Sequence, residues 1–228
     1  MPVFGFTDIE GSTGLWEKHK EAMGPIIAMH YAIMEQSIAS HGGRIVKKTG
    51  DGIFAFFPDE GGDSTKAALE SALDMQRCFQ GQVWPVIGEL RVRMAFHSGH
   101  AEEMDGDFYG PTANRTARFM SLGWGGQILV SEDLKKLARL PEGAEWLDFG
   151  MHQIKDLPEP QHIFGLAHPS LKLKEFPPLK SLSNRPNNLP EHVHPFVGRR
   201  RELKDLAGLL AAPHSRLVTL LGGGGMGK

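Results

Sequence analysis

The sequence is poor in cysteine, in net charge and in long apolar runs. One cysteine, Cys78, occurs in 228 residues, which excludes an internal disulfide and indicates a reducing compartment. Lysine and arginine number 25 against 27 acidic residues, so the formal net charge of −2 gives no basis for binding nucleic acid or an anionic membrane. No stretch has the apolar length of a membrane span, and the first residues lack the pattern of a secretory signal. We therefore expect a cytoplasmic globular protein, with no nucleic-acid or membrane contact in this chain.

The chain does contain a regular succession of short apolar strands and amphipathic helices. Apolar periodicity predicts helices over residues 15–40, 65–80, 111–122 and 131–140, the first of them broken at Gly24-Pro25. Strands are predicted over residues 2–6, 43–46, 53–57, 90–97, 125–130, 146–149 and 162–166. This order predicts an α/β fold, more specifically an α+β sandwich of helices on a mixed sheet.

An acidic residue stands where the first strand ends, in the stretch Phe6-Thr7-Asp8-Ile9-Glu10-Gly11-Ser12-Thr13. The small residues after Asp8 predict a turn with free backbone amides, and such a turn before a helix is a cradle for phosphate. A carboxylate beside phosphate is repelled unless a hard divalent cation lies between them. Asp8 is therefore a candidate metal ligand, and capping of the next helix is the alternative.

A second acidic turn, Lys47-Lys48-Thr49-Gly50-Asp51-Gly52, separates two strand-like runs. Asp-Gly is a strong signal for a hairpin turn, so Asp51 has a purely structural interpretation as well. If the strand of Asp8 lies beside this hairpin, two carboxylates meet at one edge of the sheet. That arrangement suits two metal ions about 4 Å apart in phosphoryl chemistry.

A third stretch, Asp107-Phe108-Tyr109-Gly110-Pro111-Thr112-Ala113-Asn114-Arg115-Thr116-Ala117-Arg118, follows these two along the chain. Together the three stretches resemble the class III nucleotidyl (adenylate/guanylate) cyclase catalytic domain, over about residues 1–168. The resemblance implies a ferredoxin-like cyclase fold. It also implies a reaction in which the ribose 3′-hydroxyl of a nucleoside triphosphate attacks the α-phosphate and pyrophosphate leaves.

The resemblance gives the first two stretches specific roles. Asp8 and Asp51 would hold two Mg²⁺ or Mn²⁺ ions, helped by the backbone carbonyl of Ile9. The backbone amides of the turn would cradle the triphosphate; the phosphate-binding residues expected are Glu10, Gly11, Ser12 and Thr13.

The resemblance also assigns a base-reading pair, Lys47 and Asp107. A lysine donor suits adenine N1 and an aspartate acceptor suits the exocyclic amine, whereas guanine presents the opposite polarity at both positions. Mismatched buried polar groups discriminate by roughly 10⁴-fold, which favours ATP. Lys48 is the better candidate for a solvated lysine, and Asp105 replaces Asp107 if the register shifts.

Asn114 and Arg118 match the family's transition-state pair, and their spacing of four places them on one helix face. Asn114 would orient the ribose, and Arg118 would meet charge that develops at the α-phosphate. In the family the site forms between two subunits. We expect a homodimer in which Asp8, Asp51 and Lys47 come from one subunit and Asp107, Asn114 and Arg118 from the other.

The composition changes after residue 168. Residues 169–195 are rich in proline and asparagine and are predicted to be a linker. In residues 196–228 a helix and a strand at residues 217–221 precede Gly222-Gly223-Gly224-Gly225-Met226-Gly227-Lys228, which matches a P-loop as far as Gly222, Gly227 and Lys228. This part resembles the start of an AAA-like or STAND-type ATPase, so we expect a longer protein with a downstream ATPase domain missing from this chain.

Three other functions remain open from the sequence. The cyclase domain could be a silent module that binds nucleotide or dimerises and so regulates the ATPase, but its intact site residues argue against this. A guanylate cyclase is disfavoured by the Lys47 and Asp107 pair. ATP hydrolysis by the whole protein would need the ATPase residues that follow Lys228.

Overall fold

The computed structural model describes residues 1–59, 62–182, 200–212, 214 and 217–219. The chain divides into two compact units, Met1–Arg185 and Pro186–Lys228. No helix in these described ranges is long and apolar enough to cross a membrane. The predicted site residues fall in the first unit, except for those of the P-loop.

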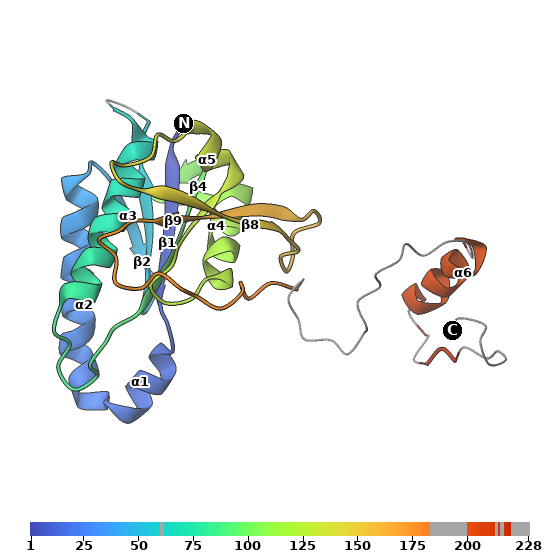
Figure 1. Ribbon diagram of the computed structural model, residues 1–228, viewed down its shortest axis with the longest axis horizontal. Coiled ribbons are helices and arrows are strands. Elements are labelled where there is room, and N and C mark those ends of the chain that lie inside the picture. Colours follow the sequence, from blue (N-terminus) through green and yellow to red (C-terminus); the bar gives the residue numbers. More distant parts are fainter. Residues whose placement is uncertain (60–61, 183–199, 213, 215–216, 220–228) are drawn as a thin grey trace. The chain divides into compact units, whose positions relative to one another are not determined.

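A seven-stranded mixed sheet forms the centre of the first unit (Figure 1), and its strand order is β2-β3-β1-β4-β7-β9-β8. The strands are β1 Val3–Ile9, β2 Arg44–Lys48, β3 Ile53–Phe57, β4 Val92–Ser98, β7 Ile128–Ser131, β8 Glu145–His152 and β9 Gln161–Ala167. Strand β1 pairs antiparallel with β3 and β4, and β4 pairs parallel with β7. The predicted mixed sheet with helices is confirmed, and β1 brings the Asp8 strand directly beside the hairpin strand β3.

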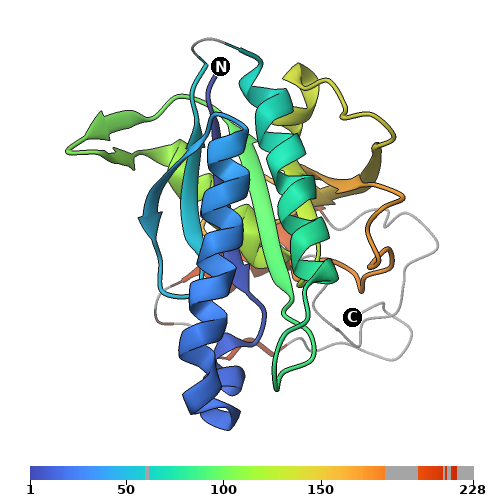
Figure 2. The same ribbon diagram turned by 90° about the vertical axis from the view of Figure 1, so that its left-hand side faces the viewer.

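Helices cover both faces of this sheet. They are α2 Lys20–Ser40, α3 Ser64–Gly81, α4 Pro111–Leu122 and α5 Glu132–Leu137. The short helix α1 Ser12–Lys18 follows β1 and contacts α2, and it has no buried residue. Figure 2 shows α2 and α3 side by side in front of the sheet, and α4 lies on the opposite face. Alternation along β1 divides the core accordingly: Val3 and Ile9 belong to the larger cluster with α2 and α3, whereas Phe4 packs with Phe54, Phe108 and Ala113.

A separate two-stranded ribbon, β5 Glu102–Met104 and β6 Asp107–Tyr109, projects beside β2 (Figure 2). Its turn is Asp105-Gly106, and both residues have positive φ angles, 53° and 80°. This is the backbone that an Asp-Gly hairpin turn requires. Asp105 is therefore the turn residue, and Asp107 lies on the strand that follows.

The break predicted at Gly24-Pro25 is wrong. Helix α2 runs through Pro25, and the chain breaks instead at His19, with φ −133° and ψ 39°. A proline clashes with the Cβ of the residue before it, and Gly24 has none. Burial of Met23 and Ile26 on either side of the proline holds this turn of the helix on the core.

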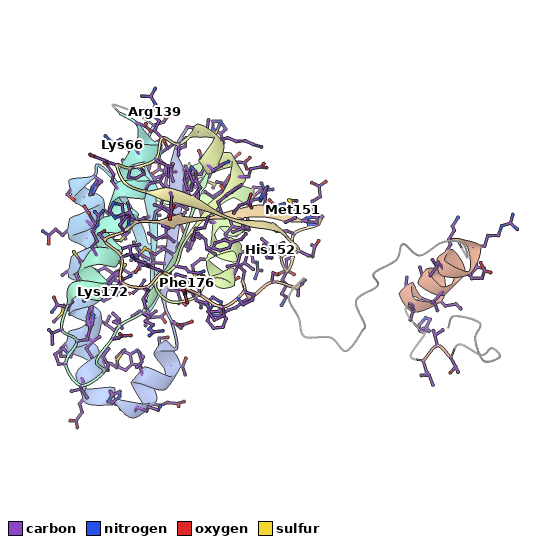
Figure 3. All side chains as sticks on the ribbon, viewed as in Figure 1. Lys66, Arg139, Met151, His152, Lys172 and Phe176 are labelled. Carbon is purple, nitrogen blue, oxygen red and sulfur yellow. The ribbon has the colours of Figure 1, made fainter. Side chains whose placement is uncertain are left out.

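The start of the predicted linker is also different. Residues 169–182 pack on the first unit, where Leu171 and Leu179 are 4% and 3% exposed. The amide of Lys172, labelled in Figure 3, donates to Gln80 Oε1 over 2.6 Å. These anchors are too widely spaced to give a periodic pattern, so composition alone suggested a linker. The rest of it, residues 183–195, lies outside the described residues.

The second unit contributes one described helix, α6 Arg200–Ala211, which agrees with the predicted helix. Residues 217–219, at the start of the predicted strand, are not in a strand. The P-loop residues Gly222, Gly227 and Lys228 lie outside the described residues.

Candidate active site

Asp8 and Asp51 meet because the turn between β2 and β3 comes very close to β1. A Cβ atom on Gly52 would lie 1.9 Å from the carbonyl oxygen of Thr7, so no residue with a side chain fits there. The Thr7 hydroxyl accepts a hydrogen bond from the Ile53 amide at 3.2 Å, which ties the turn to β1. Sequence reasoning took Gly52 as a turn residue and missed Thr7, since neither contact is visible before β1 and β3 are paired.

The groups around Asp8 have opposite effects on the pKa of its carboxyl. The β1–β4 register places it opposite Arg93, whose Nε donates to Asp8 Oδ2 at 2.8 Å and whose terminal nitrogen donates to the same oxygen. Burial raises the pKa of Asp8, the Arg93 hydrogen bond opposes this, and the nearby Asp51 carboxylate raises the pKa further. Arg93 thus pairs with Asp8, while Asp51 acts on Asp8 with the opposite effect. Arg93 was not predicted, because only the strand register reveals that it faces Asp8.

The chemistry of these donors fits a hard divalent cation. Two carboxylates and the Ile9 backbone carbonyl are oxygen ligands of the kind that Mg²⁺ and Mn²⁺ prefer. Within the described residues, no group of three or more His, Cys, Asp or Glu side chains is placed to hold a metal. The alternative role of Asp8 as a helix cap fails, because the N-cap of α1 is Gly11 and α1 has no side-chain cap.

The turn after Asp8 differs from the prediction at one residue. The Glu10 amide donates to the Arg91 carbonyl at 2.9 Å, so it is not available to a phosphate. Gly11 has φ 69°, the left-handed conformation that glycine tolerates, and it lets the chain turn into α1. The predicted cradle therefore loses Glu10, whereas Gly11, Ser12 and Thr13 remain a prediction.

Lys47 and Asp107 contact each other in one chain, with Lys47 Nζ 2.5 Å from Asp107 Oδ2. The lysine hydrogen bond lowers the pKa of Asp107, whose other oxygen accepts from the Phe108 amide at 2.8 Å. The two residues, which we expected from different subunits, therefore contact each other within one chain. This contact could not be predicted, because the sequence does not show that β6 packs beside β2.

Aromatic rings lie beneath this pair. Lys47 Nζ is 5.8 Å from the centre of the Phe54 ring, and Phe54 stacks on Phe6 with ring centres 4.4 Å apart. An apolar floor below a donor and an acceptor is the usual composition of a site for a planar heterocycle.

Asn114 and Arg118 lie on α4, as predicted, and line a cavity of about 370 Å³ together with Ala117, Asp156 and Leu157. Arg118 forms an ion pair with Asp156 over 2.7 Å. Neither Asp8 nor Asp51 lines this cavity. Sequence reasoning missed Asp156, which lies between β8 and β9 and has φ 65°. The predicted site thus has two halves: one contains Asp8 and Asp51, and the other contains Asn114 and Arg118. Within one chain, the side chains of the two halves contact different residues.

Comparison with known proteins points to one family. The family model described as the adenylate and guanylate cyclase catalytic domain matches residues 3–162. An uncharacterized protein of Mycobacterium tuberculosis is 35% identical over 203 residues, which cover 86% of this chain and 66% of that protein. The adenylate cyclase of Schizosaccharomyces pombe is 34% identical over 154 residues, which are 57% of this chain and 9% of that protein.

Solved structures agree on the fold. An adenylate cyclase from Trypanosoma brucei in its monomeric state gives a TM-score of 0.69 at 22% identity, over 78% of this chain and 92% of that chain. The guanylate cyclase domain from Catenaria anguillulae in complex with GTP gives a TM-score of 0.63 at 14% identity, over 73% of this chain and 96% of that chain. At these identities the likeness concerns the fold and does not separate the two substrates.

Proposed function

This chain belongs to the adenylate and guanylate cyclase catalytic domain family, and we propose that it is an adenylate cyclase. It would convert ATP into 3′,5′-cyclic AMP and pyrophosphate. The observation that carries the choice of ATP is the contact between Lys47 and Asp107.

The polarity of this pair favours adenine. Lys47 can only donate and the ionised Asp107 can only accept, and adenine offers N1 as an acceptor and its amine as a donor. Guanine presents a donor where adenine has N1 and an acceptor where adenine has its amine. Neither Lys47 nor Asp107 could then form its hydrogen bond. The base would separate the ion pair above the Phe54 ring, which is 1% exposed and so supports the pair from the core.

The other residues divide the work of the reaction. Asp8, Asp51 and the Ile9 carbonyl would hold two Mg²⁺ or Mn²⁺ ions, which when bound acidify the attacking hydroxyl and neutralise the phosphates. Arg93 orients Asp8 and opposes the rise that burial causes in the pKa of Asp8. Gly11, Ser12 and Thr13 would present amides to the triphosphate, Asn114 would orient the ribose, and Arg118 would stabilise the charge at the α-phosphate.

The separation of the two halves in one chain supports a homodimer. Because Lys47 contacts Asp107, we now place Lys47 with Asn114 and Arg118 rather than with the metal-binding carboxylates. Each site would combine Asp8 and Asp51 of one subunit with Lys47, Asp107, Asn114 and Arg118 of the other. A symmetric dimer then has two equivalent sites.

The test is product formation by the 228-residue chain, supplied with ATP or GTP and with Mn²⁺ or Mg²⁺ over a series of protein concentrations. We expect cyclic AMP from ATP, with a specific activity that rises as the protein is concentrated. Cyclic GMP as the main product would overturn the choice of base. Nucleotide binding without either product would instead support a silent regulatory module.

A further inference from the structure

A segment beyond the family match reaches the predicted phosphate turn. The family model ends at residue 162, whereas Lys180 places its Nζ 3.1 Å from Glu10 Oε1. The side chains of Lys180 and Glu10 are 31% and 28% exposed, so this ion pair is partly shielded from water. Nothing in the family resemblance predicts a residue in this place.

The segment, residues 178–182, is fixed to the first unit along its length. The Lys180 amide donates to the Leu122 carbonyl at 2.9 Å, and Leu179 is 3% exposed. Ser181 Oγ lies 2.9 Å from Nδ1 of His152, which is labelled in Figure 3. Lys180 is therefore held in place by its neighbours in the chain, and its position is not that of a freely rotating surface lysine.

Trp124 defines where the Lys180 ammonium lies. The Trp124 ring nitrogen donates to the Pro178 carbonyl at 3.1 Å, and Lys180 Nζ is 3.8 Å from the centre of the ring. A cation over a tryptophan face is attracted to it and loses freedom of movement. Two contacts thus hold the ammonium next to Glu10: the hydrogen bond from Trp124 to Pro178 and the packing of Lys180 on the Trp124 ring.

Glu10 is held by two contacts and lies close to Gly125. Its amide donates to the Arg91 carbonyl, its carboxylate pairs with Lys180, and a Cβ on Gly125 would lie 2.8 Å from its Oε2. Glu10 joins the metal-binding strand end to Gly11. A carboxylate at this point would repel a triphosphate, and Lys180 both neutralises it and turns it toward Gly125.

We propose that Lys180 is a positioning residue, which fixes Glu10 and with it the turn of Gly11, Ser12 and Thr13. Residues 178–182 then belong to the nucleotide-binding machinery. The part concerning nucleotide rests on the proposed function, whereas the part concerning the turn does not.

The experiment compares Lys180→Met with the 228-residue wild-type chain. Methionine keeps an unbranched apolar chain over Trp124 and removes the charge. Hydrogen exchange at the amides of residues 11–14 measures the turn directly, and binding of 3′-deoxy-ATP with Mn²⁺ measures affinity without turnover. We expect faster exchange and about fivefold weaker binding, because a partly shielded ion pair is worth about 1 kcal/mol. The KM for the nucleotide should rise similarly and kcat should stay within about twofold, since these contacts exist before and during the reaction.

Two further variants control this result. Glu10→Gln removes the same ion pair from the other side and should match Lys180→Met in hydrogen exchange, which decides whether the ion pair positions the turn if one variant folds poorly. Its nucleotide binding should weaken less than that of Lys180→Met, because the carboxylate that would repel the triphosphate is removed as well. Lys174→Met, in the residues just before this segment, should leave exchange at the turn unchanged. Unchanged exchange in both ion-pair variants, or faster turn exchange with unaltered nucleotide binding, would overturn the proposal. If the wild type itself binds no nucleotide, the proposed function fails, and the exchange data still decide whether Lys180 positions the turn.

Discussion

The two halves of the candidate site are held in different ways. At the Asp8 end, a glycine in contact with backbone and the buried Thr7 hydroxyl join β1 to the hairpin turn. At the Arg118 end, the arginine is held by an ion pair whose side chains are 46% and 53% exposed. The first half is therefore formed before any substrate arrives. The second half can rearrange, because an exposed ion pair contributes only about 0–1 kcal/mol.

The largest effect is expected from Gly52→Ala, which tests how rigid the first half is. The added Cβ would displace the turn from Thr7 and move Asp51 away from Asp8. We expect loss of cyclase activity and a fall of about 3 kcal/mol in the free energy of unfolding, measured by urea denaturation. Gly81→Ala is the control, since a Cβ there meets no atom within 4 Å. Wild-type stability in Gly52→Ala would show that the turn adapts.

Asp8→Asn and Arg118→Ala test whether the halves come from different chains. Each variant alone should lose about 10³-fold or more in kcat, through lost metal binding or lost charge stabilisation. An equimolar mixture should recover about a quarter of wild-type activity, because half of randomly formed dimers are mixed and each has one intact site. A mixture as inactive as its components would contradict the shared site.

The sequence predicted the framework of this site better than its supporting contacts. Asp8, Asp51, Asn114 and Arg118 could be found because each lies in a compact motif at a strand end, in a turn or on one face of a helix. Arg93, Asp156 and Lys180 could not, because each acts on a residue far from it in sequence through strand register or loop packing.

The contact of Lys47 with Asp107 within one chain could not be predicted for the same reason. Both residues were found by resemblance, but their contact depends on how the β5–β6 ribbon packs beside β2. Local pattern also misplaced the break near Pro25, where burial of Met23 and Ile26 outweighs the helix-breaking tendency of proline. The P-loop residues stay a prediction.

Lys47→Met tests which half the base-reading pair serves. We expect kcat/KM for ATP to fall about 10²-fold and the preference over GTP to narrow, because Asp107 loses its partner and adenine N1 loses its donor. Mixed with Asp8→Asn, this variant should recover activity; mixed with Arg118→Ala, it should not. The opposite pattern would place Lys47 with the metal-binding half. Lys48→Met is the matched control, since Lys48 pairs with Glu35 on α2.

The smallest effect is expected from Asp156→Asn, which releases Arg118 in the second half. Asparagine tolerates the φ of 65° as aspartate does, so the loop should keep its conformation. Arg118 must give up its ion pair with Asp156 to reach a phosphate with all its donors, and removing that competitor should raise kcat/KM up to about fivefold. The midpoint of thermal unfolding should hardly change. In an Arg118→Ala background the same substitution should have no effect on kcat/KM. A fall in the activity of Asp156→Asn, absent in that background, would instead mean that Asp156 holds Arg118 ready for catalysis, and both halves of the site would then be formed in advance.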